Sequence, residues 1–354
     1  MKKLKLGLVG CGNMMYSHCL SILEAGVDIT AFCDVVLERA EKTSKIVEGA
    51  YVTDDYRKLV GKCDAVLCAL PHHLHYEIGM FFAKNKIHVL MEKTMCNTDA
   101  ECERLVKTAE ENGVVLMCAY PVPYRPAVRK LKEMVDSGDY GKVIMMSSWT
   151  EQNTPVQEFS WDGCNQSGGG QFWDHGCHYV DIIMEFLGNP VRGTHIGTKA
   201  GYGAIKHPSG VDVYRMNEST SVATIQFESG AIGYHTATWS AHGTRLGWVL
   251  DIHTEKGLIH YDREDGEILF YDKLKQRKPG EDGNRDYEIV WKEDGKKSKQ
   301  TQFEIRHFAD CVLNGKTPLT NGYRTMQGLK VINRMYDAER QGIVADLRGL
   351  GHNQ

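Results

Sequence analysis

Residues 168–181 read GGGQFWDHGCHYVD and place three glycines before four side chains that can bind or transfer protons. The segment could be a phosphate-binding loop, a metal site or an acid/base device. Histidine is the residue whose ordinary pKa is closest to neutral, so His178 is the natural general base. A single helix is predicted over 170–187, and residues at positions i and i+4 of a helix share one face. Asp174 and His178 would therefore lie side by side.

Other interpretations of the same residues stay open. His178 could be a helix histidine bonded to a backbone carbonyl, and Asp174 a partner of the helix dipole. Asp181 is expected to be structural, and His175 is a candidate for the substrate pocket. Six side chains are of types that bind metals and could contribute to a metal site: His72, His73, His75, Asp174, His175 and His178. No HExxH or paired CxxC spacing is present, however, so we expect no catalytic metal.

The stretch LGLVGCGNMM has the form of a dinucleotide-binding turn. Gly10 and Gly12 follow the first apolar β-run, and a helix begins at about Asn13 and Met14. This spacing lets the backbone approach a pyrophosphate, which then lies at the helix N-terminus. The third glycine of the usual fingerprint is replaced by Met15.

Asp34 stands at the end of the second predicted strand, where a carboxylate accepts hydrogen bonds from the adenosine ribose hydroxyls. A carboxylate there would repel a 2′-phosphate, so NAD is favoured and NADP is less expected. Asp34 could also cap the following helix. Other candidates for cofactor binding follow later strands, since ligands bind at the carboxyl edge of a parallel sheet. They are Pro71, His72, His75, Glu92 and Lys93.

Apolar strands alternate with helical stretches over the first 120 residues, which predicts a parallel sheet covered on both faces. The strands are expected at 4–9, 28–34, 63–70, 86–92 and 114–120. From about 140 the pattern changes to β-runs at 221–227, 231–240, 247–253 and 257–262, which favour an antiparallel sheet. A charged stretch at 273–288 is expected to be exposed, and amphipathic helices near 303–314 and 322–341 end the chain.

The fold class is therefore α/β, with a Rossmann dinucleotide-binding domain over 1–121. An α+β domain with a large open, mainly antiparallel sheet is predicted over 122–354. An open sheet face is usually covered by another subunit, so we expect a homo-oligomer based on a dimer, a tetramer or larger.

The 354-residue chain has a net charge of -4 and no basic stripe, which argues against a nucleic-acid partner. No apolar run approaches the length that spans a bilayer, so a cytoplasmic protein with no membrane partner is expected. The 11 cysteines form no CxxC pair, and reduced, mostly buried thiols are predicted.

With these residues in place, the whole chain resembles the glucose–fructose oxidoreductase/inositol dehydrogenase family (Gfo/Idh/MocA). The resemblance rests on GCGN near the start, PHHLH at 71–75, HVLMEK at 88–93, PAVRKLKEMVDSGDYGKV at 126–143, GGGQFWDHGCH at 168–178 and HFADCVLNGKTP at 307–318. Two positions depart from the family pattern. Thr94 replaces the proline of the Glu-Lys-Pro motif, and Pro123 stands where the family often has an arginine.

The resemblance implies that Lys93, Asp174 and His178 act together in an NAD-dependent oxidation of a ring hydroxyl of a sugar or glycoside. The chain also resembles glycoside 3-dehydrogenases of gut bacteria, which oxidise the 3-hydroxyl. Two alternatives remain open at this point. One is an NAD-dependent glycosidase that acts by transient C3 oxidation and elimination, and the other is a non-catalytic NAD-binding regulator.

Aromatic faces with scattered polar groups suit a sugar ring. The candidate substrate-binding residues are Tyr120, Tyr124, Glu151, Asn153, Trp161, Trp173 and His175. Trp161 and Trp173 could instead cover the glycine loop or form an oligomer contact.

Overall fold

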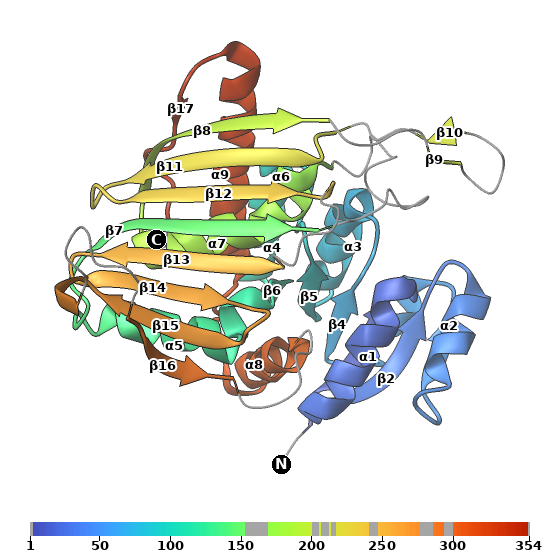
Figure 1. Cartoon of the computed structure of the whole chain (residues 1–354). Coiled ribbons are helices and arrows are strands. Elements are labelled where there is room, and N and C mark those ends of the chain that lie inside the picture. Colours follow the sequence, from blue (N-terminus) through green and yellow to red (C-terminus); the bar gives the residue numbers. More distant parts are fainter. Residues whose placement is uncertain are drawn as a thin grey trace. The chain divides into compact units, whose positions relative to one another are not determined.

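The computed structural model describes residues 3–152, 169–199, 205–206, 212–213, 217–240, 247–275, 286–293 and 300–352 (Figure 1). Asn153, Trp161 and Gly168, which the sequence singled out, lie outside these residues, as does most of the charged stretch at 273–288. The chain divides into two compact units. The first contains the described residues of 3–124 and 300–326, and the second those of 125–293 and 327–352.

The first unit is built on a parallel sheet, as predicted. The sheet has six strands, one more than the five expected, in the order β3-β2-β1-β4-β5-β6. Side chains of the central strands are buried because helices cover both faces of such a sheet. The three-residue strand β3 is too short to have been predicted from the sequence. The strands are β1 (Lys5–Val9), β2 (Asp28–Cys33), β3 (Tyr51–Thr53), β4 (Ala65–Cys68), β5 (His88–Glu92) and β6 (Leu116–Ala119).

The helices between these strands begin and end at local signals. Thr98 caps one of them by accepting the Glu101 N–H at 3.2 Å, and the Glu101 carboxylate accepts the Thr98 N–H in return at 3.1 Å. Gly26 ends another in the left-handed region, with φ 78°. The helices are α1 (Asn13–Ala25), α2 (Leu37–Ser44), α3 (His72–Lys84) and α4 (Asp99–Glu111), with short 3-10 turns η1 (Tyr56–Leu59) and η2 (Val122–Tyr124).

A helix from the end of the chain completes the first unit. Helix α8 (Thr301–Asn314) packs along α1 and contributes Ile305 and Phe308 to the same buried cluster as Leu6 and Ile22. Asn321, just after this helix, forms an antiparallel bridge with Met117 of β6. The predicted domain assignment placed this segment in the second domain, because chain order alone does not show where an amphipathic helix buries its apolar face.

The second unit contains a nine-stranded sheet in the order β16-β15-β14-β13-β7-β12-β11-β8-β17. Its neighbouring strands pair antiparallel except for β7 and β12, which run parallel, so the sheet is mainly antiparallel as predicted. The strands are β7 (Val143–Glu151), β8 (Pro190–Thr198), β11 (Thr220–Phe227), β12 (Ile232–Thr238), β13 (Trp248–Thr254), β14 (Gly257–Asp262), β15 (Glu267–Asp272), β16 (Glu288–Lys292) and β17 (Ala345–Asp346); β9 (Ile205–Lys206) and β10 (Asp212–Val213) form a separate pair.

Helices cover one face of this sheet. In Figure 1 its strands lie in front, and the helices α6 (Gln171–Asp174), α7 (Gly176–Leu187) and α9 (Gly322–Gln341) lie behind. Helix α5 (Pro126–Asp136) packs near β15 and β16. Along β7, Met146, Ser148 and Thr150 face the helices and are buried. The alternate residues face away from the helices, which leaves the other face of the sheet open among the described residues.

The open face carries a row of side chains that crosses four strands. Trp149 of β7 pairs with Thr236 of β12, Thr236 pairs with Val222 of β11, and Val222 pairs with Ile196 of β8. Trp149 is 47% exposed and Ile196 is 72% exposed. Large apolar side chains that are this exposed on a continuous sheet face are typical of a surface that binds another protein.

The predicted single helix over 170–187 is wrong in one respect. The segment forms two helices, α6 and α7, separated by a turn at His175. The His178 N–H donates to the His175 carbonyl at 3.2 Å, which is an i to i−3 bond of a tight turn. Asp174 and His178 are therefore not successive-turn neighbours on one regular helix.

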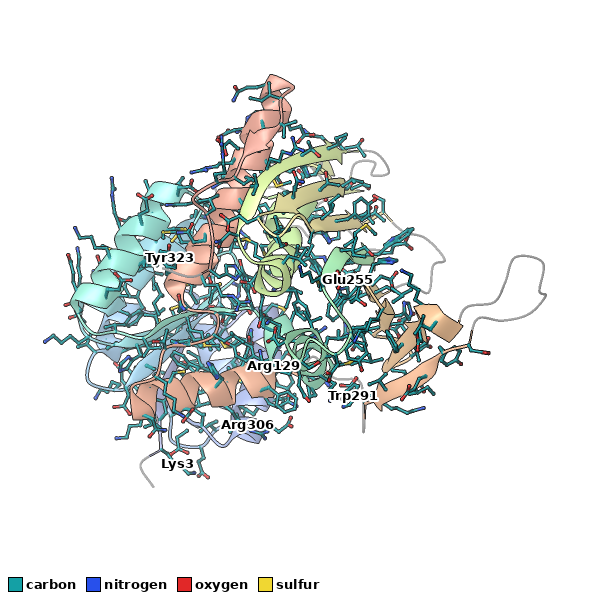
Figure 2. All side chains as sticks on the ribbon, turned by 90° about the vertical axis from the view of Figure 1, so that its left-hand side faces the viewer. Lys3, Arg129, Glu255, Trp291, Arg306 and Tyr323 are labelled. Carbon is teal, nitrogen blue, oxygen red and sulfur yellow. The ribbon has the colours of Figure 1, made fainter. Side chains whose placement is uncertain are left out.

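Long charged side chains, among them Lys3, Arg129, Glu255 and Arg306, lie at the surface, as Figure 2 shows. The ten described cysteines are free and buried, in agreement with the expectation of reduced thiols. Burial raises the pKa of the Cys19 and Cys63 thiols to about 11, so both are neutral at physiological pH. None of the described helices is both long enough and apolar enough to span a bilayer.

Candidate active site

The turn after β1 has the geometry that a pyrophosphate requires. Gly10 has φ 88°, and its N–H donates to the Cys33 carbonyl at 2.8 Å. A Cβ at Gly10 would lie 2.2 Å from the Ala69 carbonyl oxygen, so only glycine fits there, whereas a Cβ at Gly12 would meet nothing within 4 Å. Helix α1 starts at Asn13 and Met14 without a side-chain cap. Met15 is fully buried and fills core space, which explains how the chain tolerates it in place of the usual glycine.

Asp34 is attached to this turn. One carboxylate oxygen accepts the Cys11 N–H at 2.7 Å, and the other accepts the Val36 N–H at 2.9 Å. Each carboxylate oxygen has two acceptor positions, so the group can still accept ribose hydroxyls. Asp34 is not the N-cap of α2, since Val36 takes that position. The residues present therefore fit a dinucleotide with free ribose hydroxyls.

The segment after β4 is more buried than the sequence suggested. Pro71 precedes α3, and His72 lies buried within hydrogen-bonding distance of the Thr94 hydroxyl, at 3.3 Å. His75 is fully buried, and its two ring nitrogens lie 2.7 Å from the Thr94 carbonyl and 2.9 Å from the Leu70 carbonyl. Burial lowers the pKa of His75. These contacts indicate that His75 fixes the backbone around Lys93.

Lys93 follows β5 at the same sheet edge as Gly10 and Asp34. Its N–H donates to the Glu92 carboxylate at 3.0 Å, and the peptide bond to Thr94 is cis. The other Glu92 oxygen lies 2.6 Å from Nε2 of His18, a buried residue of α1. His18 and Lys93 together lower the pKa of Glu92 to about 2, against the effect of its burial. His18 was not predicted from the sequence, although its position on the helix after the glycine turn was a usable signal.

In the second unit, the segment 169–178 carries the predicted acid/base residues. Asp174 ends α6 and His178 lies in the first turn of α7, and each is only 9% exposed. The rings of His175 and His178 lie 6.0 Å apart edge to face, and His175 also lies 5.3 Å from the Tyr179 ring. The structure therefore brings His175 next to His178. Asp181 is almost fully buried and lies 3.6 Å from His352, which supports a structural role.

The predicted substrate residues fall into different places. Tyr120 is buried directly after β6, and Trp173 is buried with an indole N–H that has no acceptor among the described residues. The Tyr124 hydroxyl contacts the Thr320 hydroxyl at 3.0 Å and accepts the Thr320 N–H at 3.1 Å, so it holds the chain after α8. Glu151 accepts the Trp149 indole N–H at 2.9 Å on the open sheet face, opposite α6 and α7.

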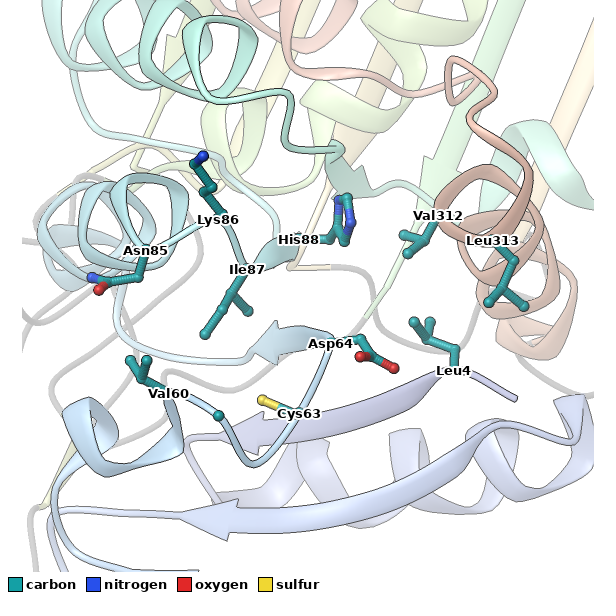
Figure 3. Close-up of a pocket in the computed structure, with 11 residues that line it drawn as sticks. Leu4, Val60, Cys63, Asp64, Asn85, Lys86, Ile87, His88, Val312 and Leu313 are labelled. Atoms are coloured by element: carbon teal, nitrogen blue, oxygen red, sulfur yellow. The ribbon is translucent and has the colours of Figure 1, made fainter. Parts of the chain in front are cut away.

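A pocket of about 380 Å³ in the first unit lies away from these residues (Figure 3). Its lining includes Leu4, Asp64 and His88, which lie at or just before the amino ends of β1, β4 and β5. Gly10, Asp34 and Lys93 lie at the carboxyl ends of the same sheet. Because dinucleotides bind at the carboxyl edge, this pocket is not the cofactor site. Among the described residues, no group of three or more metal-binding side chains occurs.

The parallel sheet, the glycine turn and Asp34 define a class of protein, the NAD-binding oxidoreductases. Comparison with known families agrees: residues 4–120 match the oxidoreductase family with an NAD-binding Rossmann fold, and residues 128–260 match the GFO/IDH/MocA C-terminal domain. The chain belongs to the Gfo/Idh/MocA family, and NAD is its cofactor.

Relatives within the family have different named activities. The chain is 24% identical over 351 residues to scyllo-inositol 2-dehydrogenase (NAD(+)) of Bacillus subtilis, covering 98% of this chain and 96% of that protein. It is 27% identical over 209 residues to 2,7-anhydro-N-acetylneuraminate hydratase of Escherichia coli, covering 57% and 52%. The solved structure of a levoglucosan dehydrogenase with NADH and levoglucosan superposes with a TM-score of 0.87 at 19% identity, covering 98% and 100%.

Proposed function

We propose that the protein oxidises a ring secondary hydroxyl of a sugar or glycoside to a ketone with NAD⁺, or catalyses the reverse reduction. Two relatives named above act on cyclic polyols or anhydrosugars, which supports this substrate class. The observation that carries the proposal is the position of Lys93, which directly follows β5 at the sheet edge that also holds Gly10 and Asp34.

Each residue of the set has a defined task. His178 takes the hydroxyl proton, because a neutral imidazole can act as a base near pH 7. Lys93 donates to the reacting oxygen and stabilises the negative charge that develops on it. Asp174 orients His178 or the substrate. Gly10, Gly12 and Asp34 would hold NAD⁺, which would supply the hydride acceptor for the reaction.

Substitution of the set tests this proposal. We expect Lys93→Ala and His178→Ala each to lower kcat/KM by at least about 100-fold, the usual contribution of a general base or charge-stabilising donor. The measurement is NADH formation with a panel containing scyllo-inositol, levoglucosan, methyl glucosides and free hexoses. Lys107→Ala changes an exposed lysine of α4 and serves as the control. Full turnover in either active-site variant would contradict the assignment.

Within this function, we propose that the oxidised hydroxyl is the one at position 3 of a glucoside-type ring. Oxidation there prepares the glycosidic bond for cleavage. A second candidate is a glycosidase that oxidises C3 transiently, removes the C2 proton and expels the aglycone. Two observations support the glycosidase candidate. One relative is named a hydratase, and His175 lies beside His178 as a second potential base. Incubation with 4-nitrophenyl β-D-glucoside distinguishes them. Nitrophenol release without net NADH supports the glycosidase, whereas a 3-keto glycoside with NADH supports the dehydrogenase.

We also propose that the protein is a dimer-based homo-oligomer that uses the open face of its nine-stranded sheet. The row formed by Trp149, Thr236, Val222 and Ile196 would bury its apolar side chains against a second copy.

A further inference from the structure

The first backbone N–H groups of a helix have no partner within the helix and need acceptors from elsewhere. Three consecutive N–H groups of α6 obtain them from two residues distant in the chain. Gln171 N–H donates to the Glu218 backbone carbonyl at 2.9 Å, and Phe172 N–H donates to the Glu218 carboxylate at 3.0 Å. Trp173 N–H donates to the Tyr336 hydroxyl at 3.1 Å. That hydroxyl in turn donates to the same Glu218 oxygen at 2.5 Å.

The backbone around Glu218 is shaped to admit its side chain. A Cβ at Gly170, which has φ 105°, would lie 2.3 Å from one Glu218 carboxylate oxygen and 2.5 Å from the other. A Cβ at Gly197 would lie 2.9 Å from the Glu218 Cγ. Gly170 therefore explains part of the glycine run that precedes Asp174. It allows a carboxylate to lie directly against the backbone at the start of α6.

Contacts behind Tyr336 hold this arrangement in place. Glu339, on the next turn of α9, accepts the Gly197 N–H at 2.8 Å and lies 2.7 Å from Nδ1 of His195. The His195 ring stacks on Phe172 at 4.4 Å. The pKa of Tyr336 is raised mainly by its burial and next by the nearby acidic residue Glu218, and Glu339 acts in the same direction. The Tyr336 hydroxyl therefore keeps its proton.

We propose that Glu218 and Tyr336 are positioning residues that fix the four-residue helix α6 and thereby set the orientation of Asp174 and the start of the helix that carries His178. This inference rests on the proposed function, in which Asp174 and His178 serve catalysis. Neither Glu218 nor Tyr336 needs to touch the substrate. Their role is to satisfy the backbone of a helix too short to be stable by itself.

The first test is Tyr336→Phe, which removes one hydroxyl and leaves the ring. Tyr323→Phe, on the same helix, is the matched control, since the Tyr323 hydroxyl forms no hydrogen bond with the described residues. Hydrogen exchange followed by mass spectrometry over residues 171–178 should show the Trp173 amide exchanging about 10-fold faster in Tyr336→Phe alone. We expect kcat on the best panel sugar to fall at least about 10-fold, with the KM for NAD⁺ unchanged, because the cofactor residues belong to the other unit.

The second test separates positioning from general damage to stability. If Tyr336 acts through Asp174, Tyr336→Phe should cause little further loss of kcat in an Asp174→Asn background, whereas independent structural damage would multiply with it. Glu218→Gln keeps an oxygen that can accept the Phe172 N–H, so it should retain more activity than Glu218→Ala. Glu228→Gln, which alters a surface hydrogen bond to Asn189, is the control for this change.

The outcomes distinguish this inference from the proposed function. Unchanged exchange over 171–178 and an unchanged kcat in Tyr336→Phe would overturn the positioning role, even if Asp174→Asn is inactive. Full activity of Asp174→Asn and His178→Ala would overturn the proposed function instead. If the wild type oxidises no panel sugar, the proposed function fails, and hydrogen exchange alone decides whether these two residues hold α6.

Discussion

At the scale of single residues, Gly10 shows how strongly the cofactor turn restricts the chain. Two separate constraints act on it: a left-handed backbone, with φ 88°, and the Ala69 carbonyl oxygen at 2.2 Å from a potential Cβ. Gly49 has a similar φ of 77° but no atom within 4 Å of its potential Cβ. The two glycines therefore separate the cost of backbone conformation from the cost of a clash.

We expect Gly49→Ala to lower the free energy of unfolding by about 1 kcal/mol, the usual cost of a left-handed conformation for alanine. Gly10→Ala should cost more, about 3 kcal/mol, because the backbone of Ala69 must also move. Gly10→Ala should in addition weaken NADH binding. Urea unfolding and NADH fluorescence titration measure the two effects. Equal destabilisation by both substitutions would show that the clash is relieved without cost.

Residues whose position depends on local sequence could be predicted, and those with distant partners could not. Gly10, Asp34 and Lys93 each follow a strand, so chain order alone places them at one sheet edge. Tyr124 has its hydroxyl at Thr320, far along the chain, and Glu151 lies on the open face because strand register decides its side. The neighbouring residues in the sequence indicate neither the hydrogen-bond partner of Tyr124 nor the sheet face on which Glu151 lies.

At the scale of elements, the His18–Glu92 pair connects α1 to the end of β5. The carboxylate lies 2.6 Å from Nε2 of His18 and accepts the Lys93 N–H at 3.0 Å. The pair thus ties the helix that follows the glycine turn to the backbone of Lys93. His18 is buried and Glu92 is partly buried, so loss of either partner would leave the other charge or polar group without compensation.

This pair makes stability depend on pH. The pKa of Glu92 is about 2 in the folded protein and near its ordinary 4.5 when unfolded, so the contribution is complete above pH 4.5 and is lost as the pH falls toward 2. Its size is on the order of 3 kcal/mol. Urea unfolding at pH 6 and pH 3.5 should show that Glu92→Gln is less stable at pH 6 and changes less with acid than wild type. Parallel pH curves for the two proteins would contradict this.

Helical periodicity correctly located the segment 170–187 but not the turn at His175. The apolar residues of both helices continue the same spacing, so the pattern carries no sign of a break. The first N–H groups of the short helix α6 donate to Glu218 and Tyr336, which lie far from it in the sequence. Partners of this kind can be identified only once the sheet and α9 are assembled.

At the scale of the whole molecule, the open sheet face gives the strongest expectation about assembly. We expect the wild type to be a dimer or larger in solution and Ile196→Glu to shift it toward monomer, since a buried charge without a partner opposes association. Size-exclusion chromatography with light scattering measures this. Ile343→Glu alters a residue that is 57% exposed outside the sheet and is the control. A monomeric wild type would exclude this use of the face.

The return of α8 to the first unit has a consequence for how that unit can form. Ile305 and Phe308 lie in the same buried cluster as Leu6 and Ile22, and Asn321 pairs with β6. A ribosome must therefore synthesise nearly the entire chain before the NAD-binding unit has all of its core. The first 119 residues therefore do not contain the complete core of this unit. A fragment that ends at β6 would expose to water the apolar side chains of α1 that pack against α8.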